Sequence, residues 1–548
     1  MMNGGLPRRG LLLAGTLGLG ALASPGGAAV ARDLLTARGF THGVASGEPG
    51  PRSMLLWTRY VAASGDAARL TVEVSETQDF RRIVVGGSVT ASPDRDWTAR
   101  LTIQGLQPGR WCYYRFIAPD GLISPVGRTR TLPVGRVEQF GLGVFSCSNL
   151  PYGWFNAYAH ASARDDLHLM VHNGDYIYEY PRGRYPDAEK AIKDRLIEPA
   201  NETILLADYR LRYASYRADA DLQRLHRLFP MVSRWDDHEI ANDAWTGGAE
   251  NHAAADGDWA ARKAAAIKAY REWLPVSDAS WTSYDIGDLA TLFQPETRLT
   301  ARSRRLDLGE VALGAENMTA AFADLRDNVL RDPARTLMGA EQEAWLRKGM
   351  AQSVRRGARW QVLTQQVVMG DLNMPPIPDG LAESLNVPPE GLGYLKAATA
   401  AAQAGLPVSL DSWGGFPAAR ARLLAAAQAA DADLVVLSGD SHNAWAFDLS
   451  EGGRPAGVEF AGHSVTSPGF ETYLPVPPEL VSQLLIGASP ELKWADTSQR
   501  GYLAVQLTPE HVTGEWVFVD TIKDRSVRTR PSRSMTVARG RRRFTSES

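Results

Sequence analysis

The chain has 548 residues, more than one hydrophobic core usually supports, so its length predicts two domains. Its formal net charge of -3 excludes a general nucleic-acid-binding surface, because such a surface needs a strongly basic face. With only two cysteines, Cys112 and Cys147, the sequence excludes a disulfide scaffold and a cysteine-rich zinc site, and a single bridge between them stays open.

Residues 1–31 are predicted to be a secretory signal peptide. The paired arginines Arg8 and Arg9 precede a short apolar stretch that ends at Leu22, and residues 29–31 match an A-x-A cleavage site. Paired arginines favour export by the twin-arginine translocase, which would place the mature chain in the periplasm or outside the cell. The apolar run is too short to span a bilayer, so we expect no stable membrane anchor.

Residues 38–133 have the pattern of a small β-sandwich domain. Short runs of strand-like residues, such as 53–59, 69–75 and 110–116, are separated by turn-rich pieces without helices. We expect this domain to support the rest of the chain.

From residue 138 to residue 525 the pattern becomes that of a layered α/β domain. Strand-like runs alternate with helical stretches, which indicates a central sheet covered by helices. The runs lie near 140–146, 167–173, 229–235, 289–294, 360–368 and 434–438, and the clearest helices at 260–274, 339–354 and 418–430. Residues 372–408, rich in Pro, Gly and Ala, are either a functional lid or a disordered insertion. The basic residues 526–548 are expected to form a flexible, solvated tail.

Chemically reactive side chains follow four of the apolar runs. Cys147 follows the first run, Asp175 the second, the stretch 235–239 the third and Asp440 the last. In open α/β sheets ligands bind beyond the carboxyl ends of the strands, so these segments are expected to converge on one crevice. Metal ions are the natural occupants of such a crevice.

The residue types favour a transition metal. Asp175 and Asp440 each follow a glycine at the end of an apolar run, and His442 adds an imidazole. Carboxylate and neutral imidazole together are the usual ligands of catalytic transition metals. Tyr178 offers a phenolate, which favours a trivalent metal such as ferric iron. Cys147 is either a small buried hydrophobe, half of a disulfide or a thiolate ligand of iron.

The stretch around His238 predicts a site for a harder cation. Asp236, Asp237 and Glu239 lie beside this histidine, and unpaired like charges raise one another's pKa values, so a multivalent cation would neutralise them. Asn242 adds an oxygen ligand suited to calcium. The alternative is a solvated acidic turn.

Taken in order, these segments resemble the alkaline phosphatase D (PhoD-like) metallophosphatases. The resemblance runs over nearly the whole chain, and the joint order of the motifs is specific although each motif alone is weak. It rests on the twin-arginine leader, on the entry segment 42–49 and on the motifs 145–149, 172–179, 235–239, 411–413 and 438–442.

The resemblance implies an α/β fold with an N-terminal immunoglobulin-like β-sandwich, followed by a calcineurin-like metallophosphatase domain that is a four-layer α/β/β/α sandwich. It also implies a phosphoric ester hydrolase that combines Fe3+ with Ca2+, the calcium as more than one ion. By motif, the iron ligands would be Cys147, Asp175 and Tyr178, with Asp175 bridging and Asp440 and His442 completing the cluster. Calcium or phosphate would be served by Asp236, Asp237, His238 and Asn242.

We expect a metal-activated hydroxide to attack phosphorus in line, without a covalent phosphoenzyme. His238 or His442 would position the leaving group or a proton, and Arg298 is a candidate for binding phosphate, with a plain ion pair as the alternative. The family pattern has Asp-Thr-Arg where this chain has Glu296 at the first position. Because glutamate reaches further than aspartate, a ligand role for Glu296 is not expected.

Other chemistries find less support in the sequence. Residues 462–466 are similar to a nucleophile elbow around Ser464, but Thr466 stands where a glycine is required. His238 begins a zinc-protease pattern, but Asn242 stands where the second histidine belongs. The remaining alternatives are a phosphodiesterase or phospholipase D of the same fold and a calcium-stabilised secreted binding protein without catalysis. We expect a monomer whose substrate is a small-molecule or lipid phosphoester, with no requirement for nucleic acid.

Overall fold

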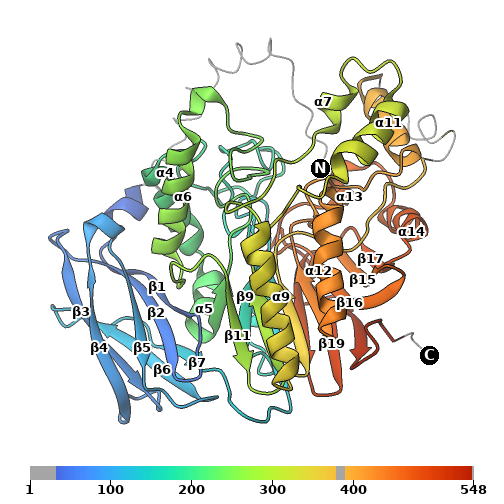
Figure 1. The fold of residues 1–548 in the computed structure, drawn as a ribbon. Coiled ribbons are helices and arrows are strands. Elements are labelled where there is room, and N and C mark those ends of the chain that lie inside the picture. The colour runs from blue at the N-terminus through green and yellow to red at the C-terminus, as the bar shows by residue number, and fades with distance from the viewer. Residues whose placement is uncertain (1–31, 378–379, 381–388, 546–548) are drawn as a thin grey trace.

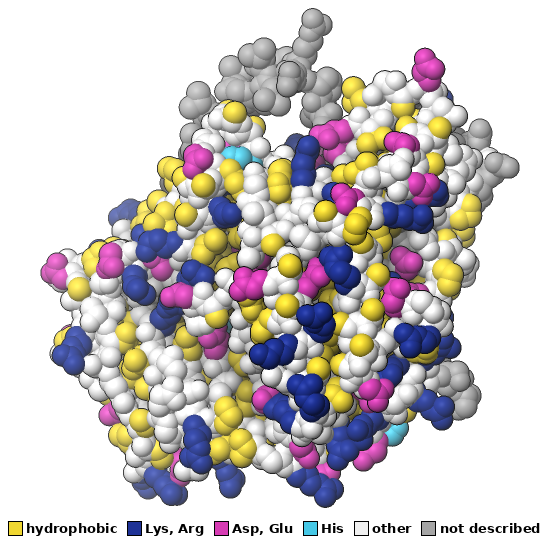
Figure 2. All heavy atoms as spheres, viewed as in Figure 1, with side chains coloured by type: hydrophobic (Ala, Val, Ile, Leu, Met, Phe, Trp, Pro, Cys, Tyr) yellow, Lys and Arg dark blue, Asp and Glu magenta, His cyan; other side chains and the backbone are white. Residues whose placement is uncertain are grey.

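The computed structural model describes residues 32–377, 380 and 389–545, so the predicted signal peptide at 1–31 lies outside the described residues. Figure 1 shows the N-terminal strands at one side of the molecule and the long helices α9 (Gly339–Arg355) and α12 (Pro417–Ala429) near the middle and right. On the face drawn in Figure 2, Lys and Arg side chains are interspersed with Asp and Glu, which agrees with the small net charge. Among the described residues, no helix combines the length and apolarity needed to cross a bilayer.

The N-terminal domain is a β-sandwich. One layer is the four-stranded sheet β4-β3-β6-β7, and the other consists of β1, β2 and β5 at the edge of a nine-stranded sheet. The two layers enclose a core of their own, which includes Leu56, Leu70 and Phe116. The strands are β1 (Gly39–Gly47), β2 (Ser53–Val61), β3 (Ala68–Ser75), β4 (Ile83–Ala91), β5 (Thr98–Gln104), β6 (Trp111–Ile117) and β7 (Gly127–Arg130).

The two domains share one sheet. β1 pairs in parallel with β10 (Pro230–Ser233), and the nine strands run without a break in the order β20-β19-β18-β8-β9-β10-β1-β2-β5. At this junction a Cβ on Gly47 would lie 2.1 Å from the backbone oxygen of Pro275, so only glycine fits. The N-terminal domain is therefore part of the sheet that carries the strand-end segments.

The second domain places two sheets face to face between layers of helices. The strands from β20 to β10 of the first sheet pack on the seven-stranded sheet β11-β12-β13-β14-β16-β15-β17, through a core that includes Leu142, Val362 and Val435. Helices α3 to α6 cover the outer face of the first sheet, and α9, α12 and α14 cover the outer face of the second. This is the four-layer α/β/β/α arrangement behind a β-sandwich, so the predicted fold class is confirmed.

The strands of this domain are β8 (Phe140–Phe145), β9 (Leu169–His172), β10, β11 (Thr282–Ile286), β12 (Ala290–Gln294), β13 (Trp360–Thr364), β14 (Leu434–Ser438), β15 (Ala444–Glu451), β16 (Arg454–Ala461), β17 (Leu492–Asp496), β18 (Gly501–Leu507), β19 (His511–Phe518) and β20 (Arg533–Ala538). Its helices are α3 (Asn156–Ala161), α4 (Leu206–Arg217), α5 (Ala220–Leu228), α6 (Trp259–Trp273), α7 (Leu308–Ala312), α8 (Met318–Asp324), α9, α11 (Pro389–Gln403), α12, α13 (Phe470–Tyr473) and α14 (Pro478–Ala488).

The apolar runs predicted the central strands closely. β8, β9, β10, β12, β13 and β14 each lie inside one of the six runs, and the three clearest helices correspond to α6, α9 and α12. Residues 372–408 contain α11, which packs with α8 in a small separate core that includes Phe322, Ala401 and Leu406. Because 378–379 and 381–388 lie outside the described residues, the lid function of this segment stays a prediction.

The prediction of a flexible tail is wrong for residues 533–545. β20 pairs antiparallel with β19 at the edge of the nine-stranded sheet, and Val537 is buried in the core between the two sheets. Met535 and Phe544 pack against the same core. Met535 and Val537 alternate with polar residues, which is the pattern of a half-buried strand that the many arginines obscured.

Candidate metal centre

The carboxyl ends of strands from both sheets meet at one edge of the domain. β8, β9 and β10 are parallel neighbours in the first sheet, and β12, β13 and β14 are parallel neighbours in the second. The two sheets are tied together there, because Asn173 Nδ2 donates to the backbone oxygen of Leu437 (3.0 Å). The segments that follow these strands therefore lie side by side.

Four of the predicted ligands have a backbone conformation that residues with a Cβ rarely adopt. Cys147, Asp175, Asp440 and His442 have φ angles of 60°, 52°, 60° and 60°. Left-handed backbone is unfavourable for such residues, and strain of this kind gathers at functional sites. The turns are held by backbone hydrogen bonds, such as the one from Cys147 N to the oxygen of Gly174 (3.1 Å).

Acidic, histidine and cysteine side chains at this edge form three groups, in each of which the ligand atoms lie within 4.8 Å of one another. The groups are Cys147, Asp175 and His442; Asp175, Asp237 and His238; and Asp236, Asp237 and Asp440. Asp175 belongs to the first and second groups and Asp237 to the second and third, so the three groups form one connected cluster. Its members are buried except for Asp440, whose side chain is 15% exposed.

The first group also includes the phenol of Tyr178. Tyr178 Oη donates to Asp175 Oδ2 (3.0 Å) and lies 3.3 Å from His442 Nε2. His442 Nδ1 donates to the backbone oxygen of Pro468 (2.8 Å), which fixes the tautomer and leaves Nε2 as the nitrogen with a free lone pair. Thiol, phenol, imidazole and carboxylate thus converge on one point.

The second group has its imidazole held in the same manner. His238 Nδ1 donates to Glu179 Oε2 (2.7 Å), so Nε2 remains as the nitrogen available to a metal or a substrate. Glu179 is fully buried and also accepts from the backbone N–H of Asn242 (2.7 Å) and from Asn251 Nδ2 (2.8 Å). The orientation of His238 is therefore set by a carboxylate that is itself fixed on three sides.

Three carboxylate oxygens of the cluster have no hydrogen-bond partner although they are buried. They are Asp175 Oδ1, Asp236 Oδ2 and Asp237 Oδ1, one from each of the three buried aspartates. Buried polar atoms are otherwise almost always paired, because an unpaired one loses its hydration without compensation. Oxygens with free lone pairs beside a thiol, a phenol and two imidazoles are the donor set that a cation requires, so these residues fit bound metal ions.

The pKa values of the buried acids also indicate a site for a cation. Burial is the largest cause that raises the pKa of Asp175, to about 7, and that of Asp236, to about 8, and the neighbouring Asp237 contributes to both shifts. Burial, followed by Asp175, raises the pKa of the Cys147 thiol well above its usual range. Such a site favours neutral acids unless positive charge is added, and a multivalent cation would return these groups to their anionic, ligating forms.

One cation of the protein already lies among these acids. The guanidinium of Arg298 is fully buried and pairs with Asp236, with Asp411 (2.6 Å), with Asp440 (3.4 Å) and with Asp237 (3.7 Å). Two members of this set have a lowered pKa, Asp237 and Asp411. Burial alone would raise both pKa values, but His238 and Arg298 outweigh burial at Asp237, and Arg298 and Arg302 outweigh it at Asp411. Arg298 therefore balances part of the negative charge of the cluster.

Two family models match the chain and divide it between them. The model described as PhoD-like phosphatase matches residues 142–516, and the one described as PhoD-like phosphatase, N-terminal domain, matches residues 27–133. The chain belongs to the PhoD-like phosphatase family. The resemblance seen in the sequence motifs is thereby confirmed.

Individual relatives support the same assignment. Alkaline phosphatase D of Bacillus subtilis (strain 168) is 32% identical over 455 residues, which cover 78% of this chain and 70% of that protein. A solved structure of PhoD superposes with a TM-score of 0.75 at 28% identity, over 93% of this chain and 92% of the other. The purple acid phosphatase PPD1 from yellow lupin (Lupinus luteus) seeds superposes with a TM-score of 0.53 at 12% identity, over 92% and 75%, and shares the fold alone.

These comparisons establish the kind of chemistry. This PhoD-like phosphatase is a metal-dependent phosphoester hydrolase, as predicted, and the alternative of a calcium-stabilised binding protein without catalysis is wrong. The expectation that the site holds metal agrees with the three ligand groups.

Most of the predicted site residues of the PhoD-like phosphatase lie in the cluster. Cys147, Asp175, Tyr178, Asp236, Asp237, His238, Asp440 and His442 lie in it, with Arg298 among their carboxylates. Asn242 donates its side-chain amide to Glu250. Its backbone N–H bonds to Glu179, so in this structure Asn242 supports the partner of His238.

Glu296 supports the loop that carries Arg298. Its carboxylate accepts from the backbone N–H groups of Arg298 (2.8 Å), Leu299 (2.7 Å) and Thr300 (2.8 Å), and from Trp235 Nε1 (2.8 Å). These four donors occupy the carboxylate, and none of the ligand groups includes Glu296. The longer glutamate thus ties the loop after β12 to the residue that precedes Asp236, in agreement with the expectation that it is not a ligand.

Sequence reasoning missed several residues of the site. Glu179 and Asp411 stand inside the motifs 172–179 and 411–413, and that position was the available signal. Glu239 was expected to face a cation together with Asp236 and Asp237, but it belongs to none of the ligand groups. Ser467, whose hydroxyl lies 2.6 Å from Tyr178 Oη, follows no strand-end motif and gave no signal. Each of these side chains holds another residue in place, a role that depends on contacts between distant segments.

The rival sites are ruled out by their surroundings. Ser464 is fully buried and its hydroxyl donates to the backbone oxygen of Ser467 (2.5 Å), so it is not presented as a nucleophile. Cys112 and Cys147 are both buried and unbonded, so the bridge between them does not form.

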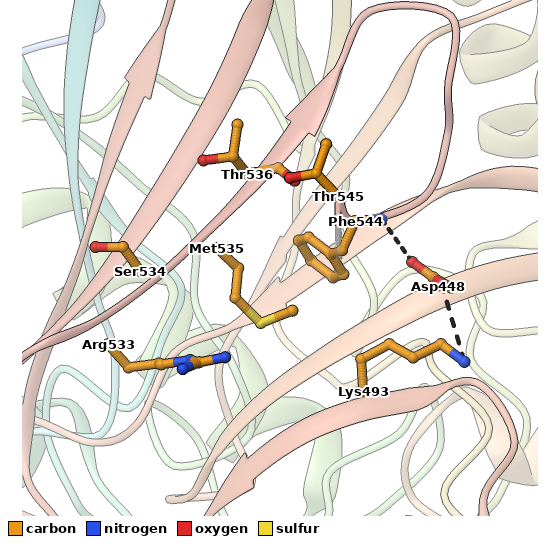
Figure 3. A pocket seen from close by; sticks show the side chains of 8 residues that line it. All are labelled: Asp448, Lys493, Arg533, Ser534, Met535, Thr536, Phe544 and Thr545. Atoms are coloured by element: carbon orange, nitrogen blue, oxygen red, sulfur yellow. Dashed lines mark hydrogen bonds and ion pairs between the residues drawn. The ribbon is translucent and has the colours of Figure 1, made fainter. Parts of the chain in front are cut away.

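A cavity of about 430 Å³ lies away from the metal centre, between the outer edges of the two sheets (Figure 3). Its walls include Asp448 of β15, Lys493 of β17 and Met535 of β20. Asp448 accepts from the backbone N–H of Phe544 (2.8 Å), and none of the lining residues belongs to a metal group. The cavity is therefore separate from the ligand groups.

Proposed function

We propose that the chain hydrolyses phosphoesters at a centre that combines ferric iron with calcium. Iron is assigned to Cys147, Asp175, Tyr178 and His442, because thiolate and imidazole suit a transition metal and phenolate suits a trivalent one. Calcium, as more than one ion, is assigned to the acids Asp236, Asp237 and Asp440 and to the group that contains His238, because hard cations prefer oxygen.

The single observation that supports this assignment best is the sharing of two aspartates. Asp175 links the group with the thiol to the group with His238, and Asp237 links the latter to the all-carboxylate group. A gradient from sulfur and nitrogen donors to oxygen donors across one cluster suits different metals at its two ends. Two separate structural calcium sites would not need a shared carboxylate.

Bound metal ions would supply Lewis acidity toward phosphoryl oxygens and a lowered pKa of water. The residues of the chain provide the remaining functions. His238, with Nδ1 held by Glu179, presents Nε2 toward the cluster and is the residue assigned to hold or deliver a proton at the leaving group. His442 is assigned to the metals, because its Nε2 lies 3.8 Å from Asp175 Oδ2 and 3.3 Å from Tyr178 Oη.

Phosphomonoesters are the proposed substrates, in agreement with the alkaline phosphatase activity named for the relative of known function. Tyr180 and Tyr185 lie beside His238, with ring centroids 5.4 Å and 6.3 Å from its imidazole, and both rings are partly exposed. They are placed to contact the leaving group. Phosphodiesters, including phospholipids, are the competing class that the experiment below separates.

We also propose in which compartment the protein acts and that it acts as a monomer. Export through the twin-arginine translocase would deliver a folded, metal-loaded protein to the periplasm or the outside of the cell, on the strength of Arg8 and Arg9 in the leader. The substrate is a small-molecule or lipid phosphoester, nucleic acid is not required, and the enzyme acts as a monomer without a stable membrane anchor.

The test is metal analysis of protein purified without added metals, together with hydrolysis of an aryl phosphomonoester and an aryl phosphodiester. The wild type should contain iron and calcium and should prefer the monoester. Cys147→Ala should lose iron and most activity, whereas Cys112→Ala, which removes the other buried cysteine from the core of the N-terminal sandwich, should keep both. Full activity in protein free of iron and calcium would refute the metal assignment, and a preference for the diester would reverse the substrate assignment.

A further inference from the structure

Glu239 is a buried carboxylate that no metal group includes. It is 1% exposed and lies in the turn after Asp236, Asp237 and His238. Its Oε2 accepts from the backbone N–H of Asp175 (3.0 Å) and from that of Asp236 (2.9 Å), and its Oε1 accepts from the backbone N–H of Tyr176 (2.6 Å). One side chain therefore binds the backbone of two ligand-bearing turns, the one after β9 and the one after β10.

The same two turns are also in direct backbone contact. Gly174 has a φ of 94°, and a Cβ built on it would lie 2.3 Å from the Cβ of Asp236 and 2.5 Å from its backbone nitrogen. The position of Asp175 relative to Asp236 is thus set on one side by this close packing and on the other by Glu239. Three hydrogen bonds to one buried carboxyl group hold the two turns at fixed positions relative to each other.

We propose that Glu239 is a positioning residue that joins the turns of Asp175 and Asp236 into one unit, so that both carboxylates are aligned for metal ions before any ion binds. Asp175 belongs to the first two ligand groups and Asp236 to the third, so this single carboxylate connects the first group with the third, which have no member in common. The inference rests on the metal-dependent function proposed above. It assigns Glu239 no contact with substrate or metal.

A purely structural role makes a different prediction. A buried glutamate that only stabilises the fold would, when replaced, lower the stability of the metal-free protein without changing the affinity of the folded protein for metal. Glu491 offers the matched comparison, because it also accepts backbone N–H groups, from Ser450 (2.9 Å) and Asp371 (3.1 Å), and it pairs with Arg420 far from the ligand groups.

The experiment compares wild type, Glu239→Gln and Glu491→Gln as full-length proteins. Metal-free samples are titrated with Ca2+ in competition with a chromophoric chelator, and their unfolding midpoints are measured separately. Since replacing outer partners of metal ligands typically weakens metal affinity or activity by about 10–100-fold, Glu239→Gln should raise the apparent Kd for Ca2+ by that factor. Glu491→Gln should lower the unfolding midpoint and leave the Kd unchanged.

The two proposals fail in distinguishable ways. Wild-type protein that binds no metal would refute the proposed function itself, whereas folded Glu239→Gln protein with the wild-type Kd would refute only the positioning role. If Glu239→Gln does not fold, a measurement on the wild type still tests the inference. In the metal-free wild type the amide protons of Asp175, Tyr176 and Asp236 should exchange slowly with solvent, because Glu239 binds them without any ion. Rapid exchange at all three would overturn the inference.

Discussion

His238 Nδ1 lies 2.7 Å from Glu179 Oε2, and both side chains are buried at the edge of the metal centre. Burial alone would lower the pKa of His238, but Asp237 and Glu179 raise it well above its usual value. Glu179→Gln keeps the shape and removes the charge, so it should lower kcat by about 10–100-fold and move the alkaline limb of the kcat profile to lower pH. The measurement is kcat for an aryl phosphate as a function of pH.

Glu202→Gln is the control for this prediction. Glu202 is a neighbouring glutamate that pairs with Arg262 (2.8 Å) and with Asn251 (3.3 Å) and does not contact His238. Its pH profile should match that of the wild type. A Glu179→Gln profile that is lowered at every pH without a shift would mean that the carboxylate does not control the proton on His238.

The sequence predicted the ligands better than it predicted what holds them. Cys147, Asp175 and Asp440 were found because each directly follows a buried apolar strand, and strand ends are local features that a sequence displays. Glu179 and Glu239 accept hydrogen bonds from residues that lie 59 to 64 positions away in the chain. Contacts of this kind depend on how the strands are ordered in the sheet, which no local pattern reports.

The errors of the sequence analysis have the same origin. The tail was predicted to be flexible because of its arginines. In the structure β20 pairs with the edge strand β19, and this pairing buries Val537 in the core. The sequence predicted two domains but not the pairing between them, in which Ser46 of β1 lies opposite Pro230 of β10, 184 residues later. Both outcomes depend on which strand edges remain unpaired after the rest of the sheet has formed.

Gly174→Ala should abolish metal binding, because the new Cβ would lie 2.3 Å from the Cβ of Asp236 and would push the two ligand turns apart. Gly121→Ala provides the control, since Gly121 has a similar φ of 87° with nothing within 4 Å of a new Cβ. Both variants carry the strain of left-handed backbone, about 1–2 kcal/mol. Only Gly174→Ala should lose metal in elemental analysis, and equal metal content in the two variants would contradict the crowding argument.

Arg298→Ala should destabilise the metal-free protein by about 3–5 kcal/mol, the usual effect of removing one partner from a buried ion pair. The reason is that Asp236 and Asp411 lose their contact with the guanidinium and remain buried. Because a divalent cation can take over part of this positive charge, added Ca2+ should restore more stability to Arg298→Ala than it adds to the wild type. Urea unfolding with and without Ca2+ measures both effects.

Arg420→Ala separates the charge effect from simple loss of a buried arginine. Arg420 is also buried and pairs with Glu491, but it lies behind the second sheet and contacts none of the ligand groups. Its loss should destabilise the protein to an extent that Ca2+ does not relieve beyond the wild-type response. If Ca2+ rescued both variants equally, Arg298 would not be the counter-cation of the cluster.

Glu459→Gln should make the stability of the metal-free protein less dependent on pH. Burial raises the pKa of Glu459 to about 7, above the value of 4.5 for a free side chain, so the folded state holds a proton that the unfolded chain releases. The stability that this proton contributes is fully present below about pH 4.5 and is lost as the pH rises through about 7. From the cited difference, the loss amounts to at most about 3 kcal/mol.

The glutamine variant carries no such proton, so its stability relative to the wild type should improve from acid to alkaline pH by up to this amount. It will be less stable than the wild type at acid pH, because the carboxyl group accepts from Ser438 Oγ (2.6 Å) and from the backbone N–H groups of Met369 (2.8 Å) and Gly370 (2.6 Å). The acids of the metal centre titrate in both proteins and cancel in the difference. Urea unfolding of the two metal-free proteins across this range is the measurement, and a constant difference would show that Glu459 does not change its protonation on folding.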